Sequence, residues 1–304
     1  MSDGQRYKDK VAVITGGSKG IGKGCVETFV KNGAKVVFCS RGEKEGKEVE
    51  SEMNSLGPGE AYFVQCDVTK ESDIKNVIDQ TVNRYGRIDC LINNAGQHPA
   101  HMPIDDFSAE DFRKLLNTNV VNYFLFSKFA LPHLRKTEGN IINDSSLVAQ
   151  IGQQGAVTYV ATKGAITAMT KALAIDEAKY NVRVNSVSPG NVWTPMWEAG
   201  ANSFSDPEAA KKAGADAQLI GRYGTLEESG LAFLYLAADA TFCTGIDLNL
   251  SGGAELNYAN KNQKGKRSLH MTRMQISFSS HIICKVWELV VIYTRQRWVL
   301  VYNK

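Results

Sequence analysis

The segment TGGSKGIG, residues 15–22, constrains this chain more than any other feature. It follows the short apolar run Val11–Ile14 and precedes apolar residues that recur at helical spacing as far as Asn32. Its glycines allow a tight turn and a close approach to a pyrophosphate, and the following helix N-terminus offers unpaired N–H groups. The segment therefore predicts a dinucleotide site that includes Thr15, Gly16, Ser18, Lys19, Gly20, Ile21 and Gly22.

The pattern of an apolar strand followed by a helix repeats along the chain. Further helices are expected over Glu43–Leu56, Glu71–Tyr85, Phe112–Leu134, Val157–Lys179 and Leu226–Ala238. Strands that are apolar throughout and alternate with helices are typical of parallel sheets covered on both sides. We predict an α/β fold with a doubly wound Rossmann-type parallel sheet of about seven strands, Val11–Ile14, Lys35–Cys39, Ala61–Gln65, Cys90–Ile92, Asn140–Asn143, Val182–Val187 and Ile246–Leu250, and helices on both faces.

Two segments depart from this rhythm. Gly190–Gln218 is rich in Asn, Trp, Pro, Gly and Ser and follows a strand end, so it is a candidate substrate lid. We expect residues 1–258 to form one domain and residues 259–304 to form an atypical basic and apolar tail. The tail from Lys261 holds nine Lys or Arg and one acidic residue but no nucleic-acid recognition motif, so we expect no nucleic-acid partner. Charges divide Ile282–Tyr302 into pieces too short to cross a bilayer, so no stable membrane insertion is expected.

The six cysteines are scattered without a CxxC pair. They are interpreted as free thiols in a reducing compartment, and the first ten residues lack the apolar core of a signal peptide. The sequence therefore predicts a cytosolic protein, and we expect no metal site.

The end of the second predicted strand bears on the choice of nicotinamide cofactor. An acidic residue there would bind the ribose diol of NAD. Here the strand ends in Ser40 and Arg41, which suit a 2′-phosphate, and Lys19 adds a second positive charge. The sequence favours NADP over NAD; alternatively Arg41 points into solvent and Glu43 or Glu45 binds the diol.

Three polar residues are predicted to converge on one edge of the sheet. Tyr159 and Lys163 are four residues apart on one helix face, and Ser146 follows the separate strand Asn140–Asn143. A tyrosine with a pKa near 10 is a poor base, but one positive charge at about 4 Å, with an effective dielectric near 20, lowers that pKa by about three units. We expect Tyr159 to take the proton of an alcohol, Lys163 to supply the charge and Ser146 to hold the reacting oxygen.

Across residues 8–257 the chain resembles the short-chain dehydrogenase/reductase family. The motifs are TGGSKGIG, Asp67 in CDV, the run Asn93-Asn94-Ala95-Gly96, Asn119, Ser146, YVATK from Tyr159 to Lys163, and Pro189-Gly190. The resemblance implies an enzyme that exchanges a hydride between a nicotinamide cofactor and a CH–OH group, with Asn119 in a proton relay with Lys163. It also implies that the cofactor is bordered by Asp67, Val68, Asn93, Ala95, Gly96, Pro189, Gly190, Val192 and Thr194, besides Tyr159 and Lys163.

Within the family, segments such as SSLVAQIGQQGAV and SPGNVWTPMWE are most similar to members that oxidise hydroxysteroids or L-fucose. This similarity implies a cytosolic homo-oligomer, a tetramer, with substrate near Ser146, Tyr159, His98, Gln153, Asn191 and Trp197. The first expectation is a 17β-hydroxysteroid such as estradiol or testosterone, and the alternative is L-fucose, oxidised to a lactone. These members are expected to use NAD, so the resemblance favours NAD where the residues favour NADP. Two departures stand out: Ser40-Arg41 replaces the acidic strand end expected for NAD use, and Asp144 stands where an apolar residue is usual. A third reading is a cofactor-binding protein without turnover, in which Asp144 or the tail has spoiled the site.

Overall fold

The computed structural model of the protein describes residues 4–259. Seven parallel strands form one sheet in the order β3-β2-β1-β4-β5-β6-β7. Their bounds are Val11–Thr15 (β1), Lys35–Ser40 (β2), Glu60–Gln65 (β3), Cys90–Asn93 (β4), Asn140–Asp144 (β5), Arg183–Pro189 (β6) and Asp247–Leu250 (β7). The predicted doubly wound sheet is confirmed.

The strand order reverses beside β1, which pairs with β2 on one side and with β4 on the other. Ligands of doubly wound sheets bind at such a reversal, outside the carboxyl ends of the strands. The loops that follow β1, β4 and β5 therefore meet at one edge of the sheet, and these loops carry the predicted site.

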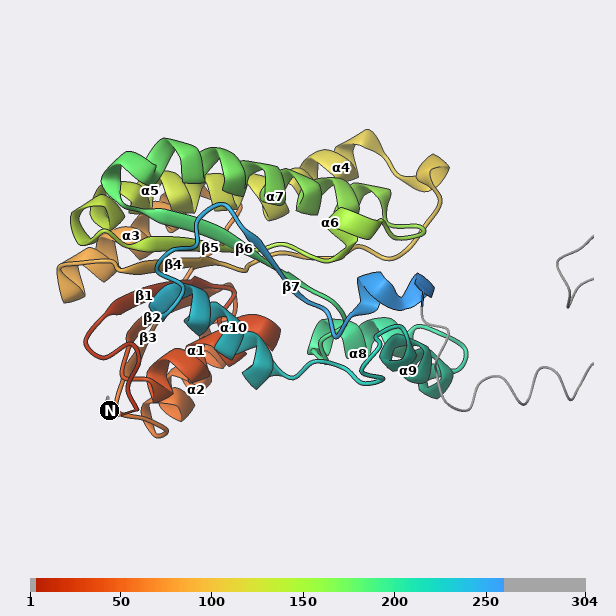
Figure 1. The fold of residues 1–304 in the computed structure, drawn as a ribbon, viewed down its shortest axis with the longest axis horizontal. Helices are drawn as coiled ribbons and strands as arrows, with labels where there is room; N and C mark the ends of the chain where they lie inside the picture. Colours follow the sequence, from red (N-terminus) through yellow and green to blue (C-terminus); the bar gives the residue numbers. More distant parts are fainter. Residues whose placement is uncertain (1–3, 260–304) are drawn as a thin grey trace, which may run out of the picture. The chain divides into compact units, whose positions relative to one another are not determined.

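Helices cover both faces of the sheet, as Figure 1 shows. One face packs on α1 (Gly20–Lys31), α2 (Glu43–Asn54) and α10 (Leu226–Ala238), and the other on α3 (Glu71–Tyr85), α5 (Asn122–Thr137) and α7 (Val157–Glu177). Each face has its own core of fully buried apolar side chains, including Phe29 and Phe233 on the first and Ile74 and Phe126 on the second. The central strands β1, β4 and β5 are buried on both sides for this reason, whereas the edge strand β7 is partly exposed.

Helices α1 and α10 touch through glycines. A Cβ atom at Gly24 would collide with the carbonyl oxygen of Leu226, and one at Gly230 with the side chain of Thr28. The two helix backbones therefore lie closer together than larger residues permit. This contact fixes the helix that follows the glycine-rich loop.

The segment Gly190–Gln218 contains two helices that the sequence analysis did not predict. They are α8 (Pro195–Asn202) and α9 (Pro207–Asp216), each with proline in its first turn. The side chains of Thr194 and Asp206 cap them by accepting bonds from the backbone N–H groups of Trp197 and Ala209.

The single predicted helix Phe112–Leu134 is also different in the structure. It consists of α4 (Ala109–Leu116), the π-helical turn η2 (Asn117–Val121) and the start of α5. Short elements complete the described residues: η1 (Ile104–Asp106), α6 (Val148–Ile151), η3 (Ala178–Tyr180) and η4 (Ala254–Ala259).

The predictions about cysteines and membranes are tested only within residues 4–259. Five cysteines are described and all are free; four are buried and Cys243 is partly exposed. No helix in the described range has the length and apolarity needed to span a bilayer. Apart from Ala259, the predicted tail lies outside the described residues, as do Cys284 and Ile282–Tyr302.

Candidate active site

The glycine-rich loop lies against the loop that follows β4. The side-chain oxygen of Thr15 accepts bonds of 2.9 Å from the backbone N–H groups of Asn94 and Ala95. Gly16 has φ +70°, and a Cβ there would lie 2.8 Å from Nδ2 of Asn94. A Cβ at Gly22 would collide with the carbonyl oxygen of Gly16. Only glycine fits these two positions, and the backbone they leave bare at the start of α1 suits a pyrophosphate.

A cavity of about 420 Å³ lies at the carboxyl ends of β2 and β3. Hydrogen bonds from Thr69, together with the charges of Lys70 and Arg41, lower the pKa of Asp67 in its wall. The hydroxyl of Ser40 is buried and has no hydrogen-bond partner among the described residues. This free hydroxyl and the bare glycine backbone fit a dinucleotide. The cavity is lined by Arg41, Gln65, Asp67, Lys70, Asp73 and Asn76.

Lys19 contributes less positive charge than the sequence suggested. Its Nζ lies 2.9 Å from Oε1 of Glu45, which neutralises part of its charge. Arg41 has no ion pair among the described residues, and its backbone carbonyl accepts a bond from Gln65. The positive charge beside the cavity therefore comes mainly from Arg41 and Lys70.

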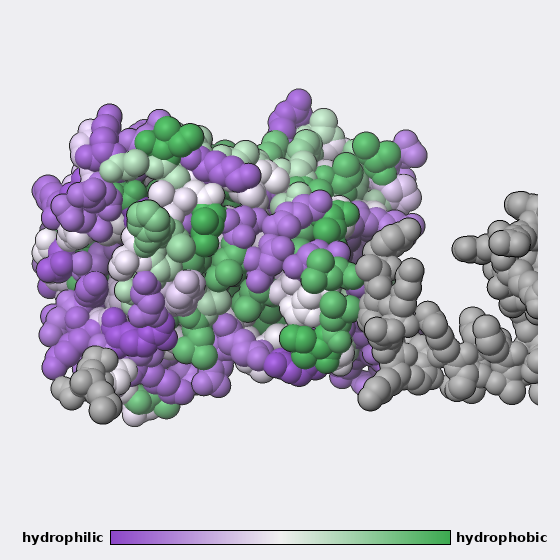
Figure 2. Space-filling model, in the orientation of Figure 1, coloured by the Kyte–Doolittle hydropathy of each residue, from purple (hydrophilic) through white to green (hydrophobic). Residues whose placement is uncertain are grey.

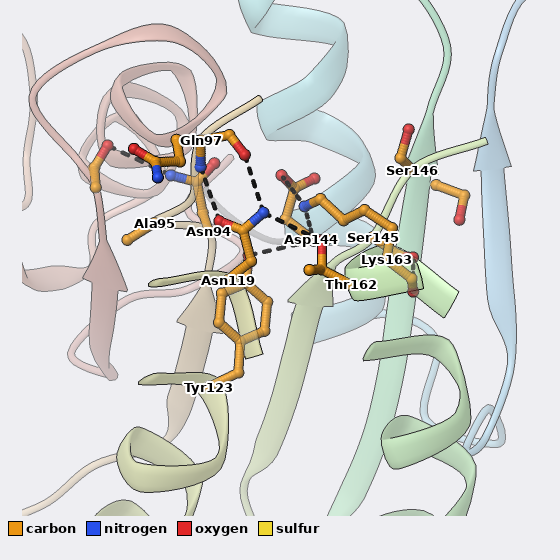
Figure 3. Close-up of polar contacts among 12 residues, drawn as sticks. Asn94, Ala95, Gln97, Asn119, Tyr123, Asp144, Ser145, Ser146, Thr162 and Lys163 are labelled. Carbon is orange, nitrogen blue, oxygen red and sulfur yellow. Dashed lines mark hydrogen bonds and ion pairs between the residues drawn. The ribbon is translucent and has the colours of Figure 1, made fainter. Parts of the chain in front are cut away.

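The structure brings the three predicted catalytic side chains together. Tyr159 and Lys163 project from α7, and the Nζ of Lys163 lies 5.7 Å from the centre of the Tyr159 ring. Ser146, in the loop after β5, lies near enough to Tyr159 to lower the pKa of its hydroxyl. Lys163 is buried and donates a 2.7 Å bond to the backbone carbonyl of Asp144, as Figure 3 shows. The ammonium group is therefore fixed, while Ser146 and Tyr159 stay partly exposed.

Opposing influences act on the acidity of Tyr159. Burial raises its pKa, Lys163 lowers it, Asp144 raises it, and the hydroxyl of Ser146 lowers it. Burial also raises the pKa of Asp144 to about 6, against the attraction of Lys163. Lys163 favours the tyrosinate, but burial outweighs it and the Asp144 carboxylate opposes it. The pKa of Tyr159 is therefore raised, and not lowered as the sequence predicted.

Asn119 sits in the π-helical turn η2, and this turn points its side chain at two neighbours. Its Oδ1 accepts a 2.9 Å bond from the backbone N–H of Gln97, and its Nδ2 donates to the carbonyl of Gln97 and to the hydroxyl of Thr162. Within residues 4–259 we find no hydrogen bond between Asn119 and Lys163. Asn119 therefore reaches the catalytic helix through Thr162, one residue before Lys163.

The two neighbouring asparagines after β4 have different surroundings. The Asn93 side chain is fully buried and donates to Asn143 at 2.9 Å, which leaves only its backbone for a cofactor. Asn94 donates to the carbonyls of Thr15 and Gly16 and so braces the glycine-rich loop. Ala95 and Gly96 continue the loop after β4, along the edge of the sheet where the cofactor is predicted to bind.

The loop after β6 closes the other side of the same edge. A Cβ on Gly190 would lie 2.9 Å from Oε1 of Gln218, and Val192 forms a bridge with Gly224. The methyl of Thr194 would lie 3.4 Å from a Cβ on Gly20. Thr194 therefore connects α8 to the glycine-rich loop. Val68 follows β3, and Pro189 ends β6.

Two of the predicted substrate residues lie beside Tyr159, and two belong to the lid. The His98 ring lies 4.0 Å from the Tyr159 ring, and its Nε2 lies 3.1 Å from Oε1 of Gln153. Asn191 is already bonded, since its Nδ2 donates to Gly214 and its Oδ1 accepts from Trp197. Asn191 and Trp197 therefore hold the lid together and offer a substrate less than His98 and Gln153 do.

The residues that hold the candidate lid together were not predicted from the sequence. Tyr223 packs against the rings of Trp193 and Trp197 at 5.1 and 4.8 Å, and the Nζ of Lys211 lies 5.2 Å from the Trp193 ring. Figure 2 shows an apolar surface over α8 and α9, where Phe204 is exposed. The aromatic spacing was visible in the sequence, but nothing in it placed Tyr223 beside residues some 30 positions earlier.

Known proteins resemble this chain along most of its length. A family model described as short chain dehydrogenase matches residues 10–203. L-fucose dehydrogenase of Bos taurus is 52% identical over 261 residues, which cover 86% of this chain and 95% of that protein. The ligand-free structure of Thermoplasma acidophilum aldohexose dehydrogenase has a TM-score of 0.75 and 31% identity, covering 83% of this chain and 96% of its own. L-sorbose reductase from Gluconobacter frateurii, complexed with NADPH and L-sorbose, has a TM-score of 0.78 and 28% identity, covering 83% and 98%. With this fold and this site, the chain belongs to the short chain dehydrogenase family and is a nicotinamide-dependent enzyme that acts on CH–OH groups.

Proposed function

We propose that this protein oxidises a sugar of the L-fucose type to a lactone, with Tyr159 as the proton acceptor. The observation that carries the proposal is the convergence of Ser146, Tyr159 and buried Lys163 at the end of β5. The substrate class is supported by the 52% identity to bovine L-fucose dehydrogenase over nearly all of that protein. Of the two substrates expected from the sequence, this similarity favours the sugar over the 17β-hydroxysteroid.

The chain's own residues move the proton. Tyr159 takes the proton of the C1 hydroxyl. The hydrogen on C1 leaves with the electron pair of the C1–H bond, as hydride, and a carbonyl forms at C1. Lys163 stabilises the tyrosinate, and Ser146 donates a hydrogen bond to the substrate oxygen as its charge changes. When bound, the nicotinamide cofactor accepts the hydride. In reduction Tyr159 returns the proton.

The mouth of the site suits a polyhydroxylated substrate. His98 and Gln153 form a polar pair against the Tyr159 ring, and both side chains carry hydrogen-bonding groups that sugar hydroxyls can engage. A steroid carries far fewer hydroxyl groups with which to engage them. This polar pair supports a sugar beside Tyr159.

For the cofactor, we propose NADP over NAD. Two residues at the end of β2 support this preference: the Ser40 hydroxyl has no partner among residues 4–259, and the Arg41 guanidinium forms no ion pair in that range. A hydroxyl and a guanidinium suit a 2′-phosphate better than a ribose diol. Arg41→Asp should weaken NADPH binding at least tenfold and strengthen NADH binding, as measured by the fluorescence of the reduced cofactors. Lys19→Met is the matched control and should change either affinity much less, because Glu45 already neutralises part of the Lys19 charge. Equal affinities of the unaltered protein for both cofactors would contradict the preference.

We also propose that the protein works as a homotetramer in the cytosol. Large apolar side chains are exposed on α5 and α7, and the five described cysteines are free. Fractionation of cells and the mass of the particle in solution test the two statements separately.

One assay tests the activity. Purified full-length protein is mixed with NADP⁺ or NAD⁺ and L-fucose, other aldoses, estradiol or testosterone, and the absorbance of reduced cofactor is followed. We expect turnover with L-fucose and a loss of at least a thousandfold in Tyr159→Phe. Turnover of the steroids alone would overturn the substrate class, and cofactor binding without any turnover would overturn the assignment as an active enzyme.

A further inference from the structure

Asp144, the last residue of β5, is a buried carboxylate beside the catalytic lysine. Its Oδ2 lies 3.8 Å from the Nζ of Lys163, and both side chains are almost wholly buried, at 11% and 6% exposed. Its Oδ1 is buried and has no hydrogen-bond partner in the described part of the chain. Figure 3 shows the Lys163 ammonium beside the Asp144 carboxylate. Burying a carboxylate with a partner at only one of its oxygens costs free energy, so the presence of Asp144 at this position needs an explanation.

Four ionisable groups face Asp144 from the elements packed around β5. They are Lys163 and Tyr159 from α7, Tyr123 from α5 and Cys25 from α1. Burial, with Asp144 as a further cause, raises the pKa of Tyr123 and of Cys25 well above the ordinary values. Both therefore stay neutral at physiological pH. Lys163 is thus the only cation in this group that can balance the carboxylate.

The single positive charge of Lys163 therefore acts on two groups, the Tyr159 hydroxyl and the Asp144 carboxylate. Its charge lowers the pKa of Tyr159, and the Asp144 carboxylate raises it. The backbone carbonyl of Asp144 holds the ammonium at 2.7 Å, so Lys163 cannot turn away from the carboxylate while it serves the tyrosine. The more Asp144 is ionised, the less the lysine favours the tyrosinate.

We propose that Asp144 is a positioning residue that acts through Lys163: its carboxylate competes with Tyr159 for the lysine's charge and so sets the pH at which Tyr159 gives up its proton. The inference rests on the proposed roles of Tyr159 and Lys163. An ionised Asp144 keeps Tyr159 protonated to higher pH, which favours proton donation in reduction and moves oxidation to alkaline pH. A neutral residue at position 144 releases the lysine and moves oxidation toward neutral pH.

The test compares the unaltered full-length protein with Asp144→Asn and Asp144→Ile. Tyrosinate absorbance near 295 nm is titrated without substrate or cofactor, and the same titration of Tyr159→Phe is subtracted to isolate Tyr159. Removing the carboxylate should lower the Tyr159 midpoint by about one pH unit or more. The pH profile of kcat/KM for oxidation should shift equally, with about tenfold more activity on its acidic side.

Asp79→Asn is the matched control, because Asp79 is an exposed carboxylate on α3 paired with Lys75 at 2.7 Å. It removes the same charge far from the site and should leave the midpoint unchanged. A midpoint that stays within about 0.2 pH units in both folded Asp144 variants overturns the proposal. Because the titration needs no turnover, a protein inactive on every sugar tested refutes the proposed function and still reports on Asp144.

One measurement needs no variant at position 144. The carbon-13 shift of the Asp144 carboxyl, followed in the unaltered protein, should show a second step when Tyr159 ionises. Tyr159→Phe should lack that step. If the carbon-13 chemical shift of the Asp144 carboxyl does not change when Tyr159 ionises, the proposal is overturned, even if neither Asp144 variant folds.

Discussion

Two adjacent serines follow β5, and their surroundings differ. The buried Ser145 hydroxyl contacts the carbonyl of Lys163 at 3.1 Å and the hydroxyl of Thr167 at 2.8 Å, so it ties the β5 loop to α7. Ser146 is partly exposed and reaches Tyr159. Ser145 therefore stabilises the loop, and Ser146 is left available for its proposed role in catalysis.

Alanine at each serine should therefore give opposite results. Ser146→Ala should lower kcat by about 10²–10³ with little change in melting temperature, because it removes a hydrogen bond to the changing charge. Ser145→Ala should lower the free energy of unfolding by about 1 kcal/mol and retain most of kcat. Steady-state kinetics and thermal unfolding of both variants check the pair, and a reversed pattern would exchange the two roles.

Asp144 should also make the stability of the protein depend on pH. Burial raises its pKa in the folded state to about 6, above the ordinary value of 3.8. A group whose folded pKa is raised contributes its stability fully below the unfolded pKa, and the contribution is lost as pH rises through the folded pKa. At about 1.4 kcal/mol per pKa unit, the loss between pH 4 and pH 7 is about 2 kcal/mol.

Asp144→Asn should consequently gain stability relative to the unaltered protein as pH rises from 4 to 7. The difference in melting temperature between the two proteins, measured at several pH values, gives the test. A difference that is constant over this range would mean that Asp144 has an ordinary pKa in the folded protein.

At the scale of elements, the contact between α1 and α10 depends on two small residues. Valine at position 230 would collide with Thr28, which sits one turn after Gly24 on α1. Overpacking a close helix contact costs about 1–3 kcal/mol. Because α1 begins at the glycine-rich loop, the strain also reaches the nucleotide site.

Gly230→Val should lower the melting temperature by about 5–10 °C and weaken cofactor binding. Gly200→Ala, inside α8 and with nothing within 4 Å of its added Cβ, is the matched control and should be neutral or slightly stabilising. Differential scanning fluorimetry with and without cofactor measures both effects. Equal melting temperatures in the two variants would show that a larger side chain at position 230 does not destabilise the contact between α1 and α10.

Elements whose formation depends on residues close together in the sequence could be predicted best. Continuous apolar runs and the glycine-rich loop are local, and they identified the seven strands within a few residues. The caps Thr194-Pro195 and Asp206-Pro207 are also local, but the unusual composition of Gly190–Gln218 hid them. These two helices could have been found.

Other features follow only from contacts between distant segments. In the π-helical turn, the Asn119 side chain hydrogen-bonds to Gln97 and Thr162, which lie 22 and 43 residues away. The burial of Asn93 depends on Asn143, and the neutralised charge of Lys19 on Glu45. The sequence identified Ser146, Tyr159 and Lys163 as a set, but it did not show that the Asp144 Oδ1 is buried without a hydrogen-bond partner among residues 4–259.

At the scale of the whole molecule, α5 and α7 leave apolar side chains in water. Phe124 on α5 is 51% exposed and Ile175 on α7 is 78% exposed. Exposed apolar residues gathered on one face of a fold are typical of a subunit interface. The proposed tetramer would bury them.

The double variant Phe124→Lys and Ile175→Lys should therefore break the tetramer into smaller species. Light scattering after gel filtration measures the mass. Leu56→Lys, on an exposed residue after α2 on the opposite face of the sheet, is the control and should keep the mass unchanged. Identical masses for all three proteins would place the interface elsewhere or show a monomer.

The reversal of strand order beside β1 has a consequence for how the chain can be divided. Residues up to Gly86 supply β1, β2 and β3, and residues from Arg87 onward supply β4 to β7, so each segment owns an unbroken part of the sheet. Gly86 itself ends α3 with φ +73°, and a Cβ added there would meet nothing within 4 Å. Two polypeptides divided at this point should recombine through the β1–β4 pairing and the Thr15 bonds to the β4 loop. A nucleotide bound at the proposed site would contact both fragments, so adding the cofactor should strengthen their association and restore activity.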